Sequence, residues 1–162
     1  MTQSLPQAAR EHHERILAHV DRMPETADAL LTAPADEVRD RLAGLHEFLR
    51  RTLLPHVDAT ERGLYPELER MFQNRHSMRP MRREHDEIRR LVGQFGAASA
   101  DAREGRPSLG RSLALRRVMF QLYALLKVHL AEEEAYLRIV ERGTDEEMGE
   151  VIAAALEHPV AG

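Results

Sequence analysis

The sequence predicts an all-α protein, an up-down-up-down four-helix bundle with a short C-terminal helix. Alanine, leucine, glutamate and arginine are abundant and tryptophan is absent, which is a composition typical of helices. Apolar residues recur at steps of three and four in four long segments, whereas strand-type alternation is not found. A chain of 162 residues is long enough for one continuous core, so we expect a single domain over residues 1–162.

The first two helical segments are separated by a proline-containing turn. The first segment covers about 5–31 and ends before TAPADE, where Pro34 fits a helix start. The second segment covers about 35–73 and is the longest. Pro55 and Pro66 fall inside it, so we expect a kink or an early end there instead of a straight helix.

Two further long segments and a short one complete the chain. The third segment starts near Pro80 and fades into GAASADAREGRPS, and the fourth covers about 108–142. Thr144 and Glu147 then have the spacing of a capping box. A short extra helix is therefore expected over 144–157.

Composition excludes several classes of function. The net charge is −4 and the estimated pI is about 6.1, so no overall positive field attracts nucleic acid. No apolar run approaches the roughly 18 to 20 residues that span a bilayer, and the N-terminus lacks a hydrophobic signal core. We therefore expect a cytoplasmic protein that binds neither nucleic acid nor membrane. Because the chain has no cysteine, any bound metal must be held by nitrogen and oxygen.

Each of the four apolar stripes contains one histidine where an apolar residue would be the safer choice. Short connections make neighbouring helices antiparallel, so the position of each histidine along the bundle axis follows from counting residues from the turn. Across the first connection and again across the third, one histidine lies about 18 residues before the turn and the other about 20 after it. An irregular stretch around NRHSMR absorbs the difference at the second connection. The histidines expected in this common layer are His13, His56, His85 and His129.

A layer of buried histidines needs a shared partner. A single inward histidine is more often a hydrogen-bonded core residue, but burying four polar rings without a common reason is unfavourable. Metal binding is such a reason, because neutral imidazole is the commonest protein ligand. In KVHLAEEEAYL, His129 and Glu133 are spaced i, i+4 and lie about 40° apart on a helix, so both point into the bundle.

The chain resembles hemerythrin-like (HHE cation-binding) domains over about 8–142. The matching motifs are HHERILAH, LLPHVDATERGLYPEL, RREHDEIRRLV and LYALLKVHLAEEEAYL. The resemblance implies a four-helix bundle that holds two non-haem iron ions through histidines and carboxylates. It also implies that the ligand is a small diatomic molecule or peroxide. The corresponding functions are dioxygen binding, peroxide or nitric oxide handling, and sensing of iron or oxygen.

Family positions can be assigned residue by residue. The first-helix histidine matches His13, with His12 as the competitor, and the third-helix histidine matches His85. The His-x-x-x-Glu pair of the fourth helix matches His129 and Glu133.

The second helix departs from the family pattern. His56 matches the family's histidine, but the bridging glutamate expected four residues later is replaced by Thr60. In the third helix Arg89 stands where relatives often have another histidine or glutamate. Glu61 lies about 140° from His56 on an ideal helix, and a kink at a nearby proline would have to rotate it inward. We include Glu61 among the predicted metal ligands, with a hydrogen bond from Thr60 to a metal-bound water as the alternative.

The remaining polar candidates are assigned lesser roles. His19 and His46 lie at similar heights outside the main layer, where we expect a small polar cluster or an access path. His76 and His158 are expected to be exposed, and Tyr136 is a possible donor near the site or a core residue.

The leading functional hypothesis is a hemerythrin-like iron protein that binds or senses dioxygen or a related small oxidant. One alternative is an enzyme whose metal turns over peroxide or nitric oxide or oxidises a small substrate. The other is a carboxylate-poor bundle with one metal ion or none that serves as an interaction module. The sequence does not determine the oligomeric state.

Overall fold

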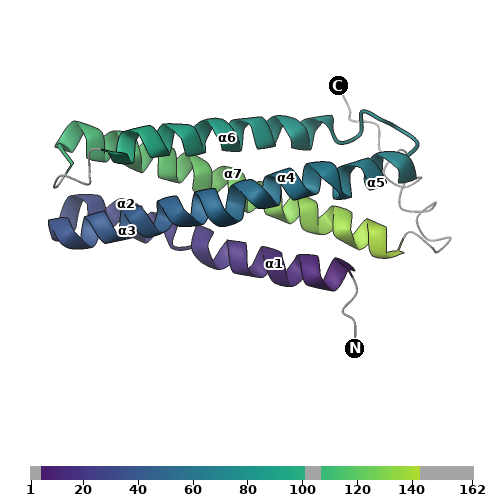
Figure 1. The fold of residues 1–162 in the computed structure, drawn as a ribbon, viewed down its shortest axis with the longest axis horizontal. Coiled ribbons are helices and arrows are strands. Elements are labelled where there is room, and N and C mark those ends of the chain that lie inside the picture. Colours follow the sequence, from purple (N-terminus) through teal and green to yellow (C-terminus); the bar gives the residue numbers. More distant parts are fainter. Residues whose placement is uncertain (1–4, 101–106, 143–162) are drawn as a thin grey trace, which may run out of the picture.

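The predicted all-α four-helix bundle is confirmed by the computed structural model, which describes residues 5–100 and 107–142. Those residues contain helices and turns and no strand. Four arms run alternately up and down the long axis of the molecule (Figure 1). The chain order of the elements is therefore that of an up-down-up-down bundle.

The first arm consists of two helices, α1 (Leu5–Val20) and α2 (Met23–Thr32). The sequence predicted one segment here, and the break falls just before Pro24. Because proline has no backbone N–H and its ring collides with the carbonyl four residues earlier, α1 does not continue through it. The arm ends at Ala33, which is extended as expected for a residue before proline.

The second arm is interrupted twice. It comprises α3 (Ala35–Phe48), the π-helical turn η1 (Leu49–Leu53), α4 (Leu54–Arg62) and α5 (Leu64–Met71). The π turn ends two residues before Pro55, and the break at Gly63 precedes Pro66 by three residues. Pro66 cannot donate to the carbonyl of Arg62, which explains why α4 ends there. The irregularity that the two prolines predicted is thus present at both places.

The third and fourth arms are single helices, α6 (Arg79–Ser99) and α7 (Leu109–Arg142). Turns over residues 72–78 join α5 to α6, in the stretch that the sequence marked as irregular. None of the described helices, α7 included, is long and apolar enough to cross a membrane. The predicted helix over 144–157 lies outside the described residues.

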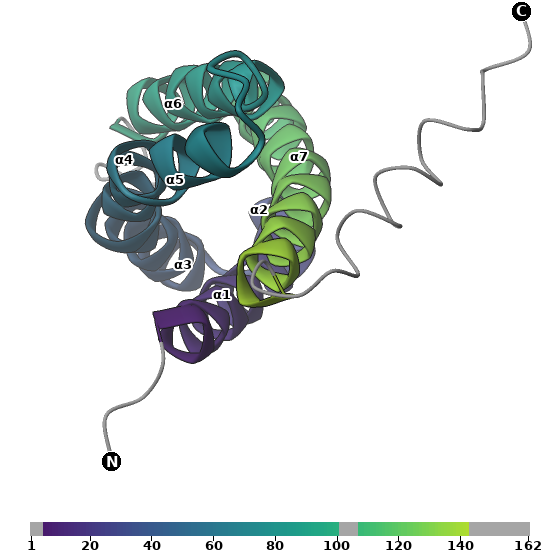
Figure 2. The same ribbon diagram turned by 90° about the vertical axis from the view of Figure 1, so that its right-hand side faces the viewer.

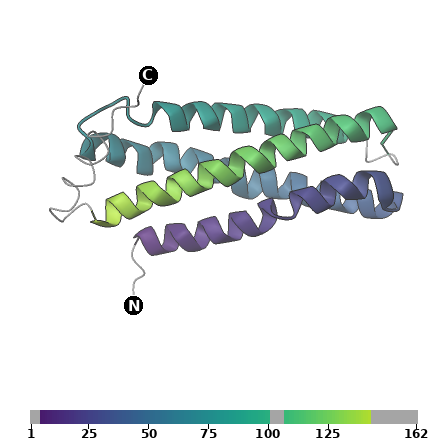
Figure 3. The same cartoon turned by 180° about the vertical axis from the view of Figure 1, so that it is seen from behind.

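Seen end-on, the four arms surround a common axis (Figure 2). Helix α7 lies between α6 on one side and the α1–α2 arm on the other, and it contacts all three. The view from behind shows α7 crossing the bundle obliquely over most of its length (Figure 3). The second arm completes the ring through contacts of α3 with α2 and of α4 with α6. Side chains from all four arms therefore reach the axis.

The apolar core along this axis is divided into two clusters. The larger cluster includes Ile16, Leu53 and Ile88, and the smaller one includes Tyr65 and Met81. On each helix that contributes to both clusters, a few polar positions separate the two sets of apolar residues. A polar layer thus lies between the two apolar clusters.

Candidate metal centre

The polar layer is made of one buried histidine from each arm and one buried glutamate. His13 comes from α1, His56 from α4, His85 from α6, and His129 and Glu133 from α7. His56 is the most exposed of the five at 6%, while His85 and Glu133 are at 0%. The structure thus brings together the four histidines that counting along the helices placed in one layer.

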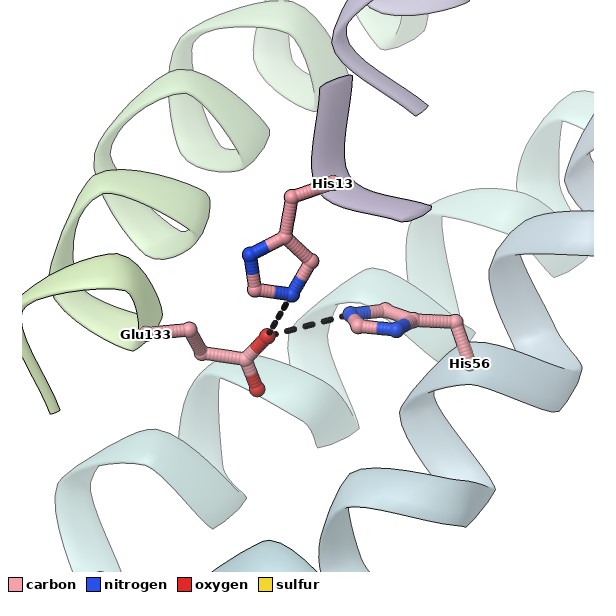
Figure 4. A group of neighbouring side chains, drawn as sticks. All are labelled: His13, His56 and Glu133. Carbon is pink, nitrogen blue, oxygen red and sulfur yellow. Dashed lines mark hydrogen bonds and ion pairs between the residues drawn. The ribbon is translucent and has the colours of Figure 1, made fainter. Parts of the chain in front are cut away.

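One carboxylate oxygen of Glu133 faces two of the rings. Its Oε2 lies 3.2 Å from Nε2 of His13 and 3.0 Å from Nε2 of His56 (Figure 4). Figure 4 shows both imidazoles converging on this oxygen from different helices. We call His13, His56 and this side of Glu133 the His13–His56 half-site.

The other carboxylate oxygen faces the remaining two rings. Oε1 of Glu133 lies 3.5 Å from Nε2 of His129 and 3.7 Å from Nε2 of His85, and these two nitrogens are 2.9 Å apart. We call His85, His129 and this side of Glu133 the His85–His129 half-site. In each half-site the three candidate ligand atoms lie within 4.8 Å of one another. A single glutamate therefore links two triads.

Glu133 is held as a carboxylate by its neighbours. Burial by itself would raise the pKa of Glu133, but hydrogen bonds from His129, His13, His56 and His85 hold that pKa well below its ordinary value. A buried anion surrounded by four imidazoles is unfavourable unless it is paired. The centre is therefore a buried negative charge enclosed by imidazole nitrogens, an arrangement that suits a cation.

Tyr65 belongs to the centre and was missed by the sequence analysis. Its hydroxyl donates to Oε1 of Glu133 at 2.7 Å and lies 3.1 Å from Nε2 of His85. Burial and then the charge of Glu133 raise the pKa of Tyr65, so the phenol keeps its proton. A straight-helix stripe leads from Thr60 to Leu64, whereas after the break at Gly63 it is Tyr65 that is fully buried. Such a break does not show in the apolar periodicity.

Glu61 occupies a different position from the one predicted. Its Oε1 lies 2.9 Å from Nδ1 of His85, the ring nitrogen that points away from the centre, and 2.9 Å from Nη1 of Arg89. Arg89 also donates to Asp58 at 2.9 Å. Burial would raise the pKa of Glu61, but hydrogen bonds from Arg89 and His85 lower it. The structure therefore places Glu61 outside both half-sites, as the partner of a ring within one of them.

Glu84 plays the same part for His129 and was also missed. Its Oε2 lies 2.8 Å from Nδ1 of His129. Burial alone would lower the pKa of His129, but Glu133 and then Glu84 outweigh it and raise that pKa. Glu84 directly precedes His85 in RREHDE. A carboxylate next to a predicted ligand, on the side of its helix toward the next helix, is the signal that could have identified it.

Thr60 and His12, the two residues that the sequence left as alternative contributors to the site, have contacts that show where they lie. The Thr60 hydroxyl donates to the carbonyl oxygens of His56 and Val57, at 3.2 and 3.1 Å, which is a local bond within its own helix. His12 lies beside the His56 ring, with ring centres 5.2 Å apart, and its Nδ1 is 3.4 Å from Arg15. His13 and not His12 is therefore the first-arm member of the layer.

The other predicted polar residues lie away from the centre. His19 stacks on Phe48 with ring centres 4.5 Å apart, and His46 lies 6.3 Å from the Phe95 ring. These two histidines form no joint cluster among the described residues. Tyr136 packs against the smaller apolar cluster. His76 is exposed, as predicted, and His158 lies outside the described residues.

The donors present fit a metal centre of nitrogen and oxygen ligands. Each half-site offers two imidazole nitrogens and a carboxylate oxygen, which is a common donor set for first-row transition metals. The Nδ1 atom of His13 is buried and has no hydrogen-bond partner. Because Nε2 of this ring faces Glu133, the unpartnered Nδ1 is the outer nitrogen and is not one of the candidate donors.

Fold and site together define a helical bundle protein with an internal histidine–carboxylate centre for cations. The family model described as hemerythrin HHE cation binding domain matches residues 6–137. The chain therefore belongs to the hemerythrin HHE family, and the resemblance noted in its motifs is confirmed. No curated protein and no solved structure matches the chain significantly.

Proposed function

We propose that the chain binds two non-haem iron ions in the polar layer and binds or senses dioxygen or a related small oxidant there. The observation that carries this proposal is the position of Glu133, whose two oxygens face two separate pairs of histidines. A carboxylate with one oxygen toward each of two ligand sets is suited to bridge two metal ions. The family's cation-binding character supports the same conclusion.

In this proposal the ligands are His13, His56, His85, His129 and Glu133. When bound, iron supplies a redox-active centre at which a small oxidant can be held. The rings set the position of the donor atoms, and the two apolar clusters lie on either side of the layer. Glu61 and Glu84 orient the rings of His85 and His129 from outside.

Metal content and the visible spectrum test the proposal. Protein produced in iron-rich medium is expected to contain two iron ions per chain and to show an absorption band that changes reversibly with oxygen. A His129→Ala variant should lose most of this iron, while His76→Ala, which removes an exposed loop histidine, should retain it. Absence of bound iron from the wild-type protein would contradict the proposal, and one ion per chain would restrict it to a mononuclear centre.

Tyr65 favours a second candidate, the turnover of peroxide. Its hydroxyl lies inside the layer and hydrogen-bonds the shared carboxylate, so a hydrogen-bonding group stands next to the place where an oxidant would bind. Peroxide consumption by iron-loaded protein should then fall in Tyr65→Phe while the iron content stays unchanged. Tyr123→Phe, in the middle of α7, is the matched control. Equal rates for wild-type protein and Tyr65→Phe would contradict this candidate.

A further inference from the structure

The two half-sites differ in what holds their histidine rings. In the His85–His129 half-site both outer nitrogens face a carboxylate, Glu61 at 2.9 Å and Glu84 at 2.8 Å. In the His13–His56 half-site the structure records no carboxylate within hydrogen-bond distance of either outer nitrogen among the described residues. The nearest approach is Oε2 of Glu134, at 3.9 Å from Nδ1 of His13.

These partners decide which ring nitrogen carries the hydrogen. An ionised carboxylate accepts hydrogen bonds and does not donate them, so Nδ1 of His85 and of His129 each carry a hydrogen. With Nδ1 bonded to a carboxylate, Nε2 is the nitrogen that each of these rings can offer to a metal ion. In both rings Nε2 points to the centre, and the two atoms are 2.9 Å apart. Two facing lone pairs at this distance repel each other unless a proton or a metal ion lies between them.

The opposite arrangement holds in the His13–His56 half-site. Both Nε2 atoms face the same oxygen of Glu133, so each ring donates its hydrogen inward and keeps its lone pair on the outside. Metal binding through Nε2 requires the hydrogen to move to Nδ1. For His13 that atom is buried without a partner, so the new donor would be unsatisfied.

We propose that the two metal positions fill in order, the His85–His129 half-site first and with higher affinity. This inference rests on the proposed metal-binding function and adds which half-site is occupied when metal is scarce. At low metal supply the chain then holds a single ion between α6 and α7, and the second ion joins α1 and α4 to it. Glu61 and Glu84 are positioning residues in this scheme.

Titration of the metal-free protein with Co²⁺ tests the order. Co²⁺ accepts nitrogen and oxygen ligands, and its visible absorption reports on coordination. Under anaerobic conditions, calorimetry and absorption should show two steps, the first at least about tenfold tighter than the second, as expected when one pair of rings has carboxylate partners. At one equivalent, proton NMR should show paramagnetically shifted imidazole N–H signals of two rings that exchange slowly with solvent.

Matched variants identify the half-site that fills first. Glu84→Gln should weaken the first step about 10- to 100-fold and change the second step much less. Glu134→Gln, next to His13 but beyond hydrogen-bond distance, should leave both steps within about threefold of wild type. Glu61→Gln serves in place of Glu84→Gln if circular dichroism shows that the latter is not folded.

The outcomes separate this inference from the proposed function. Two steps of equal affinity, or a first step that Glu84→Gln leaves unchanged, would overturn the order while metal binding stands. Failure of the wild-type protein to bind Co²⁺ or iron at all would overturn the proposed function and the order with it.

Discussion

At the scale of single residues, the centre depends on atoms that are not themselves candidate ligands. Glu61 and Glu84 lie behind two of the rings, and Tyr65 holds one oxygen of Glu133. Each of these side chains hydrogen-bonds a candidate ligand and thereby orients its donor atom. The sequence identified the four histidines and Glu133 because they interrupt apolar stripes. It missed Glu84 and Tyr65 and assigned Glu61 as a ligand, because apolar spacing does not report which polar side chains face a neighbouring ring.

Replacing the shared carboxylate should affect both metal positions together. Glu133→Gln keeps the size of the side chain but removes the negative charge that both half-sites use. We expect the metal content per chain to fall by more than half, measured by elemental analysis after metal-rich expression. Glu132→Gln, the exposed neighbour, is the control and should retain the wild-type content. Full occupancy of one position in Glu133→Gln would show that the glutamate is not shared.

Stability of the metal-free protein should depend on pH in both directions. The pKa of Glu133 lies below its ordinary 4.5 in the folded state, so its contribution is present above pH 4.5 and is lost as pH falls through the folded pKa. The pKa of His129 lies above its ordinary 6.5, so its contribution is present below pH 6.5 and is lost as pH rises through the folded pKa. Urea unfolding should therefore show greatest stability between about pH 4.5 and 6.5.

The alkaline side of this profile has a specific control. Glu84→Gln removes one of the two carboxylates that raise the pKa of His129. Its stability should therefore fall off with rising pH at a lower pH than that of the wild-type protein. If both proteins lost stability over the same alkaline pH range, the assignment of this loss to His129 would be contradicted.

At the scale of elements, the second arm shows where periodicity fails. The stripe read along a straight helix correctly included Leu53, His56 and Leu68, all of which are buried. The two prolines predicted an irregularity at both places, but the apolar stripe did not give its form, which is the π turn η1 and the helix break at Gly63. Both features depend on hydrogen bonds of the backbone, and apolar spacing of three and four does not report them.

The π turn accommodates one extra residue, which gives a test by deletion. A π turn closes its hydrogen bonds over five residues instead of four, so removing Arg51 should convert η1 to regular α-helix and keep His56 facing the layer. Deleting the exposed Asp40 from α3 should instead rotate the flanking parts of the arm by about 100° relative to each other. We expect near wild-type metal content for the first deletion and a large loss of stability for the second, measured by elemental analysis and thermal unfolding. Equal damage from both deletions would contradict this view of η1.

At the scale of the whole molecule, the polar layer joins all four arms. Its five candidate ligands come from α1, α4, α6 and α7, which are far apart in sequence. An ion held by residues of different arms binds the folded state and not the separated helices. Metal binding should therefore stabilise the bundle as a whole.

Metal removal should lower the melting temperature. At a free metal concentration 100 times the Kd, binding contributes about 2.7 kcal/mol, which for a chain of this length corresponds to roughly 5 to 10 °C. Calorimetric melting of metal-free and metal-loaded protein checks this. Glu133→Gln should show a much smaller shift, whereas an equal shift in that variant would place the stabilising ion elsewhere.

The sequence by itself predicted the helical class, the four segments and the family, and it named the five residues that meet in one layer together with Glu61, which does not join them. Those features depend on local spacing along a helix and on counting residues from each turn, which the chain order contains. The tertiary structure decided that Tyr65 points inward, that Glu61 lies behind His85, and that the two half-sites differ. These facts depend on how α4, α5, α6 and α7 are rotated against one another, and that rotation is set by backbone irregularities and packing between elements distant in the sequence.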